Sequence, residues 1–574
     1  MRNSKKFPAA GRIKNLLGLA ITLLFSLISI TYADEYGVLL SEDAEAIIWW
    51  AEGAYKVMKN DPPPHARTRT GGIRIACARN EYEPFLLLIR PRQDMERISV
   101  MMSPLVGKDG GRLPGSTISI CHVGYVKVMV PTDEFGKPGE WPDPLPPYEG
   151  PFAASAGENA SLWITVYIPE DAPAGEYRSS LAMSSGAWKR EIPVVVKVWD
   201  FSLSKETHIR SSFGLPTDDL RRYHNLETRE ELEKVTDLYY QNLRDHRLAP
   251  TSPLELYPLK ARVRGIAWEG GEFVSDPVHS GSQALKVEDV SFSLTAEARS
   301  AEKIPVETGK PYRLTWHAKT AAAKQPYTVL IQCYDGEEDH LPPRNELRVY
   351  EGSTEWKQDF QEIKGFLPDV RTVTLHFFPV FRDESGSSTG TAYFDDVCFG
   401  PALADTNLLP RGDMETDLDA LSVEVDFSEF DRGARRYLDE FGFNVFNLSL
   451  EGLGSGSFYS HREGFFAGFR QGTAAYDRLL SLYLGIVEKH LEENGWLGKE
   501  YIYWFDEPDP DDYPFVREGM MNIRRAAPKL TRFITEHRPG PDIMDVSEIS
   551  CTIFHRVDPD IIAELSRKDR EFWS

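Results

Sequence analysis

The chain has 574 residues and a formal net charge of −23. Such an acidic balance repels phosphate groups, which argues against nucleic acid as a partner, whereas a neutral glycan meets no such repulsion. Aromatic residues account for 11% of the sequence, and 43 Gly and 39 Pro residues supply many turns. This composition is typical of a folded protein and not of a disordered one, and the length predicts three or four domains.

Residues 1–33 have the pattern of an export signal. A basic segment precedes an apolar run over 16–30, and Thr31-Tyr32-Ala33 resembles the small-x-small motif of a cleavage site. We expect cleavage and not a membrane anchor, because the apolar run is shorter than the roughly 20 residues that span a bilayer. The mature protein would then begin at Asp34, contain no integral membrane span, and lie in the periplasm or outside the cell.

Residues 34–205 are predicted to form a β-sandwich. Short apolar or alternating runs such as 85–90, 162–168 and 192–198 are separated by turns rich in Gly and Pro. Several short strands with this punctuation are typical of two packed antiparallel sheets.

The five cysteines have no Cys-x-x-Cys spacing, so we expect no zinc site. Cys77 and Cys121 fall within one predicted domain, and Cys333 and Cys398 fall within another. Each pair is compatible with a disulfide in an oxidising compartment. The alternative is that these residues are small free thiols packed inside strands.

Residues 206–260 and 402–574 alternate between strand and helix patterns. Thr228 begins a capping box before one helix, and Thr473 caps another. Repeated strand–helix units indicate parallel strands with helical crossovers, whose closed form is a (β/α)8 barrel. We count six strands and the start of a seventh at 571–573, so we expect an incomplete barrel, as in a truncated sequence.

The strand–helix pattern is interrupted over 261–401, where strand-like alternation recurs without helical spacing. We therefore predict an inserted β domain. It resembles the β jelly-roll carbohydrate-binding modules in the motifs at 279–285 and 393–397. In that fold the terminal acidic pair, here Asp395 and Asp396, often helps to hold a structural Ca²⁺. A solvated acidic pair at a strand end is the alternative.

The segment 501–508, Tyr-Ile-Tyr-Trp-Phe-Asp-Glu-Pro, is an aromatic strand that ends in two carboxylates. It is the fourth barrel strand in our count, and active sites of such barrels lie at the C-terminal ends of the strands. Neighbouring strand residues point to opposite faces, so Asp506 and Glu507 reach one ligand only if the backbone turns, as Pro508 favours. The alternative is an acidic loop that is solvated or caps the next helix.

Two carboxylates at one site suit the cleavage of a glycosidic bond. One carboxyl group must be protonated to help the leaving oxygen depart, and the other must be ionised to stabilise positive charge. The pair also suits a mechanism in which the 2-acetamido oxygen of the substrate is the nucleophile. Asp506 would then orient and polarise the acetamido N–H, while Glu507 would donate the proton and later recover it.

These residues resemble glycoside hydrolase family 123, the exo-acting β-N-acetylgalactosaminidases and their relatives. The resemblance covers nearly all of 65–574 and includes the motifs at 78–85 (Ala-Arg-Asn-Glu-Tyr-Glu-Pro-Phe) and 503–508 (Tyr-Trp-Phe-Asp-Glu-Pro). It implies a β-sandwich followed by a (β/α)8 barrel, with the adjacent catalytic pair of the family at Asp506 and Glu507. It also implies release of terminal β-linked N-acetylgalactosamine from a glycan or glycolipid, by a retaining mechanism with an oxazoline intermediate.

Three further polar residues lie at the ends of predicted strands and are candidates for binding sugar hydroxyls: Asn447, Glu536 and His537. A structural role is the alternative for each. No cofactor or catalytic metal is expected. Two other functions remain open: a non-catalytic carbohydrate-binding protein with a degenerate or truncated barrel, and an exoglycosidase for another sugar. The retained carboxylate pair favours the hydrolase.

Overall fold

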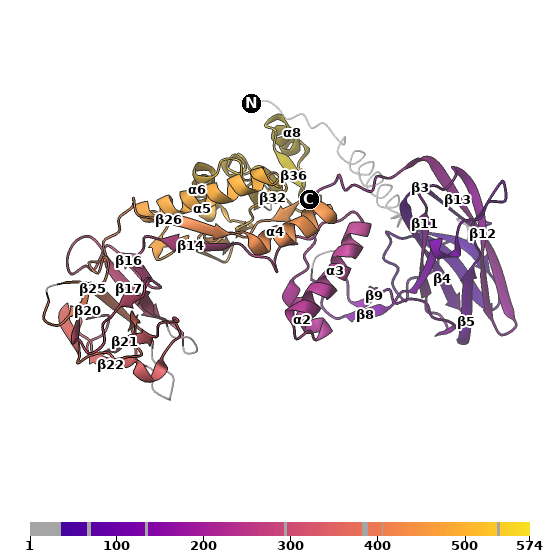
Figure 1. Cartoon of the computed structure of the whole chain (residues 1–574). Coiled ribbons are helices and arrows are strands. Elements are labelled where there is room, and N and C mark those ends of the chain that lie inside the picture. Colours follow the sequence, from indigo (N-terminus) through magenta and orange to yellow (C-terminus); the bar gives the residue numbers. More distant parts are fainter. Residues whose placement is uncertain are drawn as a thin grey trace, which may run out of the picture. The chain divides into compact units, whose positions relative to one another are not determined.

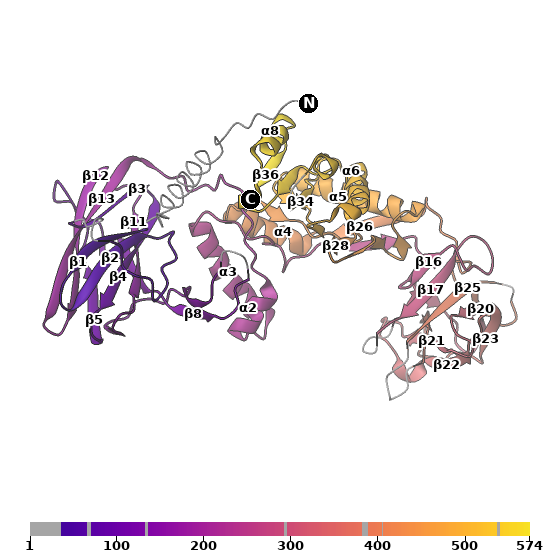
Figure 2. The same cartoon turned by 180° about the vertical axis from the view of Figure 1, so that it is seen from behind.

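The computed structural model describes residues 36–65, 71–132, 136–291, 296–381, 389–404, 406–536 and 540–574. The predicted export signal, with its cleavage site before Asp34, lies outside the described residues. Among those residues, no helix is both long and apolar enough to cross a membrane. The chain divides into two compact units, Met1–Lys205 and Glu206–Ser574, and the first is coloured indigo to purple in Figures 1 and 2.

The first unit is a β-sandwich. Its strands are β1 (Gly37–Glu42), β2 (Ala46–Glu52), β3 (Ile73–Arg79), β4 (Glu81–Pro91), β5 (Met95–Met102), β6 (Val106–Gly107), β7 (Ile118–His122), β8 (Tyr125–Val128), β9 (Gly139–Pro142), β10 (Phe152–Ala154), β11 (Ala160–Ile168), β12 (Gly175–Ser185) and β13 (Trp188–Ser202). One sheet has the order β1-β2-β4-β11-β7, and the other has the order β10-β5-β12-β13-β3. The strands β8 and β9 form a separate hairpin.

Alternating apolar residues explain why these strands pack face to face. In β11, Leu162, Ile164 and Val166 are fully buried, and the residues between them are only partly buried. Side chains alternate across a strand, so this pattern directs one face into the core. Cys77 is buried in the same core.

The second unit contains a curved sheet of short parallel segments. Its strands are β27 (Phe446–Asn447), β32 (Glu500–Tyr501), β34 (Phe533–Thr535), β35 (Ile549–Cys551) and β36 (Glu571–Trp573). Parallel bridges join Phe213 to Pro250 and Ile502 to Arg532, and Asn447 N donates to Thr251 O at 2.8 Å. The segments therefore follow one another in chain order, as in a (β/α)8 barrel, but the described residues of 206–574 form a half-barrel and no closed ring.

The strands of this half-barrel are shorter than the sequence pattern predicts. The segments 208–215 and 248–253 contribute a single bridge instead of two strands. Pro250 has no N–H group and therefore cannot donate to a ladder, which limits the pairing there. The predicted strand at 501–505 is divided, since β32 pairs with β27 whereas β33 (Phe505–Asp506) pairs with β28 (Ser455–Ser457).

Helices cover the half-barrel, and α5 and α6 lie side by side in both views (Figures 1 and 2). Their bounds are α2 (Thr217–His224), α3 (Arg229–Asp245), α4 (Ser428–Ala434), the π-helical turn η4 (Arg435–Glu440), α5 (Ala474–Glu493), α6 (Tyr513–Ala526), α7 (Pro541–Met544) and α8 (Pro559–Arg567). The capping box of Thr228 and Glu231 is confirmed at the start of α3. Thr473 caps α5 as predicted, because its side chain accepts a bond from Tyr476 N.

The segment between β14 (Lys260–Arg264) and β26 (Ser422–Asp426) is a second β-sandwich. Its strands are β15 (Trp268–Glu269), β16 (Glu272–Val274), β17 (Ala284–Asp289), β18 (Ala298–Ser300), β19 (Ile304–Pro305), β20 (Tyr312–Thr320), β21 (Pro326–Tyr334), β22 (Glu346–Glu351), β23 (Lys357–Ile363), β24 (Thr372–Phe378) and β25 (Gly390–Pro401). The two sheets have the orders β15-β18-β24-β21-β22 and β16-β17-β25-β20-β23. The antiparallel pair β14–β26 joins the entry and exit of this insert.

All five cysteines are free in the structure, so neither predicted disulfide is formed. Cys77 and Cys333 are buried, and burial raises the pKa of each thiol to about 12. A thiol reacts through its thiolate, so both residues behave as small apolar side chains inside strands. For Cys77 and Cys333 the alternative of small free thiols packed inside strands is the one observed, whereas Cys398 is exposed.

Candidate active site

Asp506 and Glu507 lie at the C-terminal end of the fourth parallel segment of the half-barrel. The strand β33 pairs in parallel with β28, where Ser457 is the partner of Asp506. Gly456 permits this approach, because a Cβ atom there would lie 2.3 Å from the ring of Phe505. The Asp506 side chain is exposed, and Glu507 is partly buried.

Two hydroxyl groups fix the carboxylate of Asp506. Tyr503 Oη donates to Asp506 Oδ1 at 2.5 Å, and Thr535 Oγ1 donates to the same oxygen at 3.1 Å. The two hydroxyl oxygens are 3.1 Å apart. The two hydrogen bonds to one oxygen hold the Asp506 carboxylate in a fixed orientation.

The backbone turns at Glu507, as access of both carboxylates to one ligand requires. Glu507 has a φ of +44°, in the left-handed region that a non-Gly residue seldom adopts. Its N–H donates to Thr535 Oγ1 at 3.0 Å, which stabilises this conformation. Thr535 on β34 thus binds the side chain of Asp506 and the backbone of Glu507 at the same time.

Other carboxylates of this loop cap the following helical turn. Asp509 and Asp512 form a capping box at η5 (Pro510–Asp512), with Asp509 N donating to Asp512 Oδ2 at 3.2 Å. Asp506 accepts its bonds from Tyr503 and Thr535 instead. The capping interpretation therefore applies to Asp509 and Asp512 and does not account for Asp506.

A cluster of aromatic rings packs against Tyr503. The rings of Tyr501, Phe533 and Trp573 pack with centroid separations of 4.9–5.5 Å. Tyr503 stands edge-on against Phe533 at 5.1 Å. Burial, followed by the hydrogen bond to Asp506, raises the pKa of Tyr503. Its phenol therefore remains a hydrogen-bond donor throughout the physiological pH range.

The three predicted sugar-binding residues have different surroundings. Asn447 Oδ1 accepts a bond from Tyr503 N at 3.3 Å, so this side chain supports the strand that leads to Asp506. Glu536 is buried, accepts from Tyr513 Oη at 3.0 Å, and follows Thr535 directly. His537 lies outside the described residues. Asn447 and Glu536 thus belong to the segments on either side of β32.

Sequence reasoning missed a hairpin that lies beside the carboxylates. It consists of β28 and β29 (Ser460–Arg462), and its tip carries Phe458 and Tyr459. These side chains are 41% and 84% exposed, and their ring centroids are 4.0 Å apart. Because Ser457 pairs with Asp506, the exposed rings follow within two residues of the candidate site. Exposed aromatic rings offer apolar faces on which a sugar ring can stack.

The hairpin is attached to α6. The ring of His461 stacks on Phe515 at 4.3 Å, and His461 Nδ1 lies 3.3 Å from Asp512 Oδ1. The available sequence signal was the pair Phe458 and Tyr459, which lies between a Gly-rich segment and polar residues. The pairing partner of this short strand lies about 50 residues away in the chain, and no local pattern reveals it.

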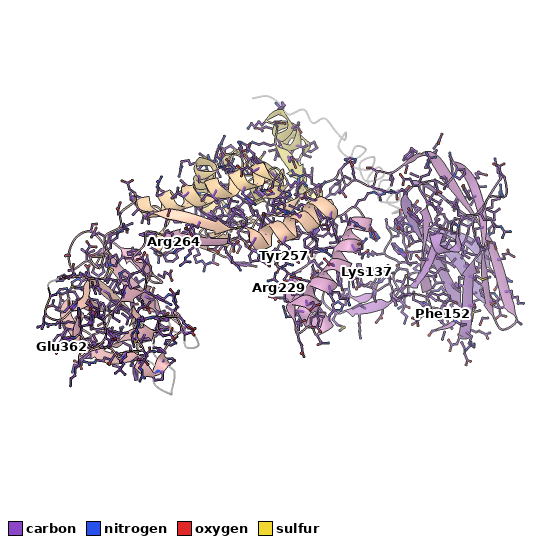
Figure 3. The ribbon with its side chains drawn as sticks, in the orientation of Figure 1. Lys137, Phe152, Arg229, Tyr257, Arg264 and Glu362 are labelled. Carbon is purple, nitrogen blue, oxygen red and sulfur yellow. The ribbon has the colours of Figure 1, made fainter. Side chains whose placement is uncertain are left out.

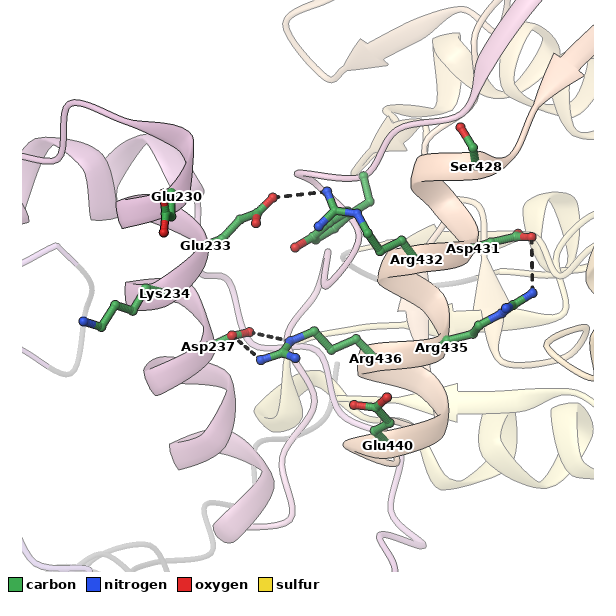
Figure 4. A pocket seen from close by; sticks show the side chains of 11 residues that line it. Glu230, Glu233, Lys234, Asp237, Ser428, Asp431, Arg432, Arg435, Arg436 and Glu440 are labelled. Carbon is green, nitrogen blue, oxygen red and sulfur yellow. Dashed lines mark hydrogen bonds and ion pairs between the residues drawn. The ribbon is translucent and has the colours of Figure 1, made fainter.

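The second unit contains one cavity at the ends of strand segments and one groove between helices. A cavity of 280 Å³ is lined by Asn447, Ser449, Ser252 and Glu255 at the ends of two segments of the half-barrel. A groove of 830 Å³ lies between α3 and α4 (Figure 4). There Arg432 pairs with Glu233, and Arg436 pairs with Asp237.

The interhelical groove is a packing feature between helices. Arg432 and Arg229 also lie over the ring of Tyr257, at 4.6 and 5.7 Å from its centroid, and Figure 3 labels Arg229 and Tyr257. Three arginines of this groove, Arg432, Arg435 and Arg436, are therefore each paired with a carboxylate of the protein. Its walls are helical, whereas Asp506 lies at a strand end.

The acidic pair of the insert, Asp395 and Asp396, accepts hydrogen bonds from groups of the protein. Asp395 Oδ2 accepts from the N–H groups of His279 and Ser280, and Asp395 Oδ1 accepts from Asp396 N. Asp396 accepts from His279 Nδ1 at 2.6 Å and from Ser280 Oγ at 2.8 Å. The carboxylate oxygens therefore bind protein donors, and the imidazole of His279 is one of them.

No family model and no curated protein matches the chain. Among solved structures, a family 123 glycoside hydrolase from Clostridium perfringens is similar at 10% identity and a TM-score of 0.46, over 88% of this chain and 67% of that one. A family 16 carbohydrate-binding module is similar at 14% identity and a TM-score of 0.18, over 24% of this chain and 96% of the module. A xylan-binding domain from Paenibacillus barcinonensis is similar at 11% identity and a TM-score of 0.18, over 26% of this chain and 87% of that domain.

Proposed function

We propose that this protein is an exo-acting glycoside hydrolase that releases terminal β-linked N-acetylgalactosamine from a glycan or glycolipid. The observation that supports this most directly is the position of Asp506. It is an exposed carboxylate fixed by Tyr503 and Thr535 at the end of a parallel strand, next to a second carboxylate on a left-handed backbone. The sequence resemblance of segment 503–508 to family 123 supplies the sugar and the mechanism.

Asp506 acts as the partner of the acetamido group. Both of its bonds from described residues end on Oδ1, so Oδ2 has lone pairs available for the acetamido N–H. As the acetamido oxygen attacks C1, positive charge develops on the acetamido nitrogen. A carboxylate held at that nitrogen stabilises this charge more in the transition state than in the ground state, which is the requirement for catalysis.

Glu507 acts as the general acid and base. In the first step its carboxyl group gives a proton to the leaving oxygen while the C1–O bond breaks and the oxazoline ring closes. In the second step the carboxylate removes a proton from water, which attacks C1 and reopens the ring. Two displacements at C1 give net retention of configuration.

The exposed rings of Phe458 and Tyr459 supply a surface for the sugar beyond the cleaved bond. They belong to the hairpin that pairs with the strand of Asp506. The leaving group of an exo-acting enzyme extends outward from the site, toward an exposed surface. The 41% and 84% exposure of the two rings is compatible with such contact.

The decisive experiment compares two nitrophenyl β-glycosides that differ only at C2. The purified full chain should hydrolyse the 2-acetamido-2-deoxygalactoside and leave the plain galactoside intact, because only the former carries the internal nucleophile. A thiazoline analogue of the intermediate should inhibit strongly. Equal rates on the two glycosides would refute the substrate-assisted mechanism. Binding of the acetamido sugar without any hydrolysis would instead assign the protein as a carbohydrate-binding protein.

A further inference from the structure

Two histidines and one aspartate of the inserted sandwich meet on the outer face of one sheet. His317 lies on β20, and its neighbours Trp316 and Ala318 are buried in the core, so its own side chain points outward. On the adjacent strand β25, Asp396 has a φ of +49°, and the register between β20 and β25 shifts beside it. Such a β-bulge redirects a side chain, and here it brings Asp396 toward His317.

The third member, His279, comes from a loop that is fixed at both ends. Asp395 binds the backbone of His279 and Ser280, as described above. Glu415 binds the loop three residues later, through Ser282 N and Ser282 Oγ. The backbone of this loop is therefore held at both ends, and the adjustment left for binding a ligand is reorientation of the His279 ring.

The three side chains converge within metal-binding range. His279 Nδ1 lies 2.6 Å and His317 Nδ1 lies 3.8 Å from the same atom, Asp396 Oδ2. The two imidazole rings are stacked with centroids 3.6 Å apart. One ligand atom from each residue lies within 4.8 Å of the others. His317 Nδ1 is also buried and has no hydrogen-bond partner among the described residues.

We propose that His279, His317 and Asp396 form a binding site for a divalent transition-metal ion such as Zn²⁺. Two imidazole nitrogens and one carboxylate oxygen are the donors that Zn²⁺ prefers, whereas Ca²⁺ requires six to eight oxygens. This site lies in the inserted sandwich and is separate from Asp506 and Glu507. It replaces the structural Ca²⁺ that the jelly-roll resemblance implies.

To accept the ion, the two imidazole rings must leave their parallel stack, because an imidazole nitrogen coordinates a metal in the plane of its own ring. Tetrahedral coordination with metal–nitrogen bonds of ~2.0 Å separates the ligand atoms by about 3.3 Å. The two measured separations to Asp396 Oδ2, 2.6 and 3.8 Å, lie on either side of this value. Binding would displace the proton that His279 shares with Asp396 and would give the unpartnered nitrogen of His317 a ligand.

The test uses metal binding and is independent of enzymatic activity. Tag-free full chain, stripped with a chelator, is titrated with Zn²⁺ and Ca²⁺ by calorimetry and with Co²⁺ by visible absorption. His317→Phe preserves the ring stack but removes the nitrogen, and Asp396→Asn weakens the anionic ligand. His340→Ala is the matched control, because His340 is an exposed histidine of the same sandwich. Thermal melting verifies that each variant is folded.

The proposal predicts one equivalent of bound Zn²⁺ and ligand-field bands with Co²⁺. His340→Ala should bind as the wild type does, and His317→Phe should bind at least about 100-fold more weakly, since even outer-shell partners contribute 10–100-fold. Zn²⁺ binding that is unchanged in His317→Phe would overturn the assignment. A wild-type chain that binds no Zn²⁺, or that binds Ca²⁺ in preference, would overturn it equally.

Discussion

At the scale of single residues, the proposed mechanism depends on the hydrogen bonds that Tyr503 and Thr535 donate to Asp506. Both hydroxyls contact Oδ1, and Thr535 also accepts the N–H of Glu507. In the proposed mechanism these are positioning residues, because they would act on the substrate through the two carboxylates. The edge-on contact between Tyr503 and Phe533 limits the movement of the Tyr503 ring.

Tyr503→Phe removes one hydrogen bond to a charged group and keeps the ring. Such bonds contribute about 1.5–3 kcal/mol, so we expect kcat to fall at least about 10-fold while KM changes little. The control is Tyr476→Phe, which removes a neutral bond to Gly452 O in the same unit. Steady-state kinetics and thermal melting of both variants make the comparison. Equal losses of kcat in the two variants would reduce Tyr503 to a structural role.

The sequence predicted Asp506 and Glu507 as the catalytic pair but not the contacts that hold them. Two adjacent carboxylates after an aromatic strand form a local pattern, and Pro508 pointed correctly to a turn. Thr535 lies 28 residues after Glu507, and its contact with that residue arises only from the parallel pairing of neighbouring segments. A side chain that acts across strands leaves no spacing signal in the chain, so the contacts of Tyr503 and Thr535 with Asp506 were found only in the structure.

At the scale of elements, the hairpin β28–β29 is expected to decide how well long substrates bind. Replacing both Phe458 and Tyr459 by Ala removes the exposed rings and leaves the backbone pairing with β33. We expect KM for an N-acetylgalactosamine-terminated oligosaccharide to rise about 10-fold, since a good aromatic contact is worth about 0.5–1.5 kcal/mol. A nitrophenyl glycoside, which has no further sugar, should be affected less.

Phe201→Ala is the control for this double variant, because Phe201 is an exposed aromatic residue of the first unit. It should leave both KM values unchanged. If the double variant raised KM equally for the oligosaccharide and the nitrophenyl glycoside, the rings would not contact the second sugar.

Helices were predicted better than strands for a physical reason. Their signals are local: Thr228 and Thr473 cap the residues that follow them in the chain. Strand length instead depends on a partner that lies far away in the sequence. The paired segments are therefore shorter than the apolar runs in the sequence predict. Phe213 and Pro250 form a single bridge, and β27 has two residues.

At the scale of the whole molecule, the chain comprises a β-sandwich unit and a second unit in which a half-barrel carries an inserted sandwich. Changes in the spacing of apolar residues along the sequence revealed these segments, because a strand repeats every two residues and a helix about every 3.6 residues. The curvature of the half-barrel sheet was not predictable, since register between parallel segments is set by three-dimensional packing. The same holds for the bulge at Asp396, which creates the histidine–aspartate cluster.

The central claim is that Asp506 and Glu507 divide the work of acid catalysis and acetamido activation. It is tested most directly by the rates of wild-type, Glu507→Gln and Asp506→Asn chains on aryl 2-acetamido-2-deoxy-β-galactosides with leaving groups of increasing pKa. Glu507→Gln should lose about 10²–10⁴-fold on poor leaving groups and little on good ones, because a good leaving group departs unprotonated. Asp506→Asn should slow every substrate to a similar extent. Near-wild-type rates in both variants would contradict the account, and a leaving-group dependence that followed Asp506 would reverse the two roles.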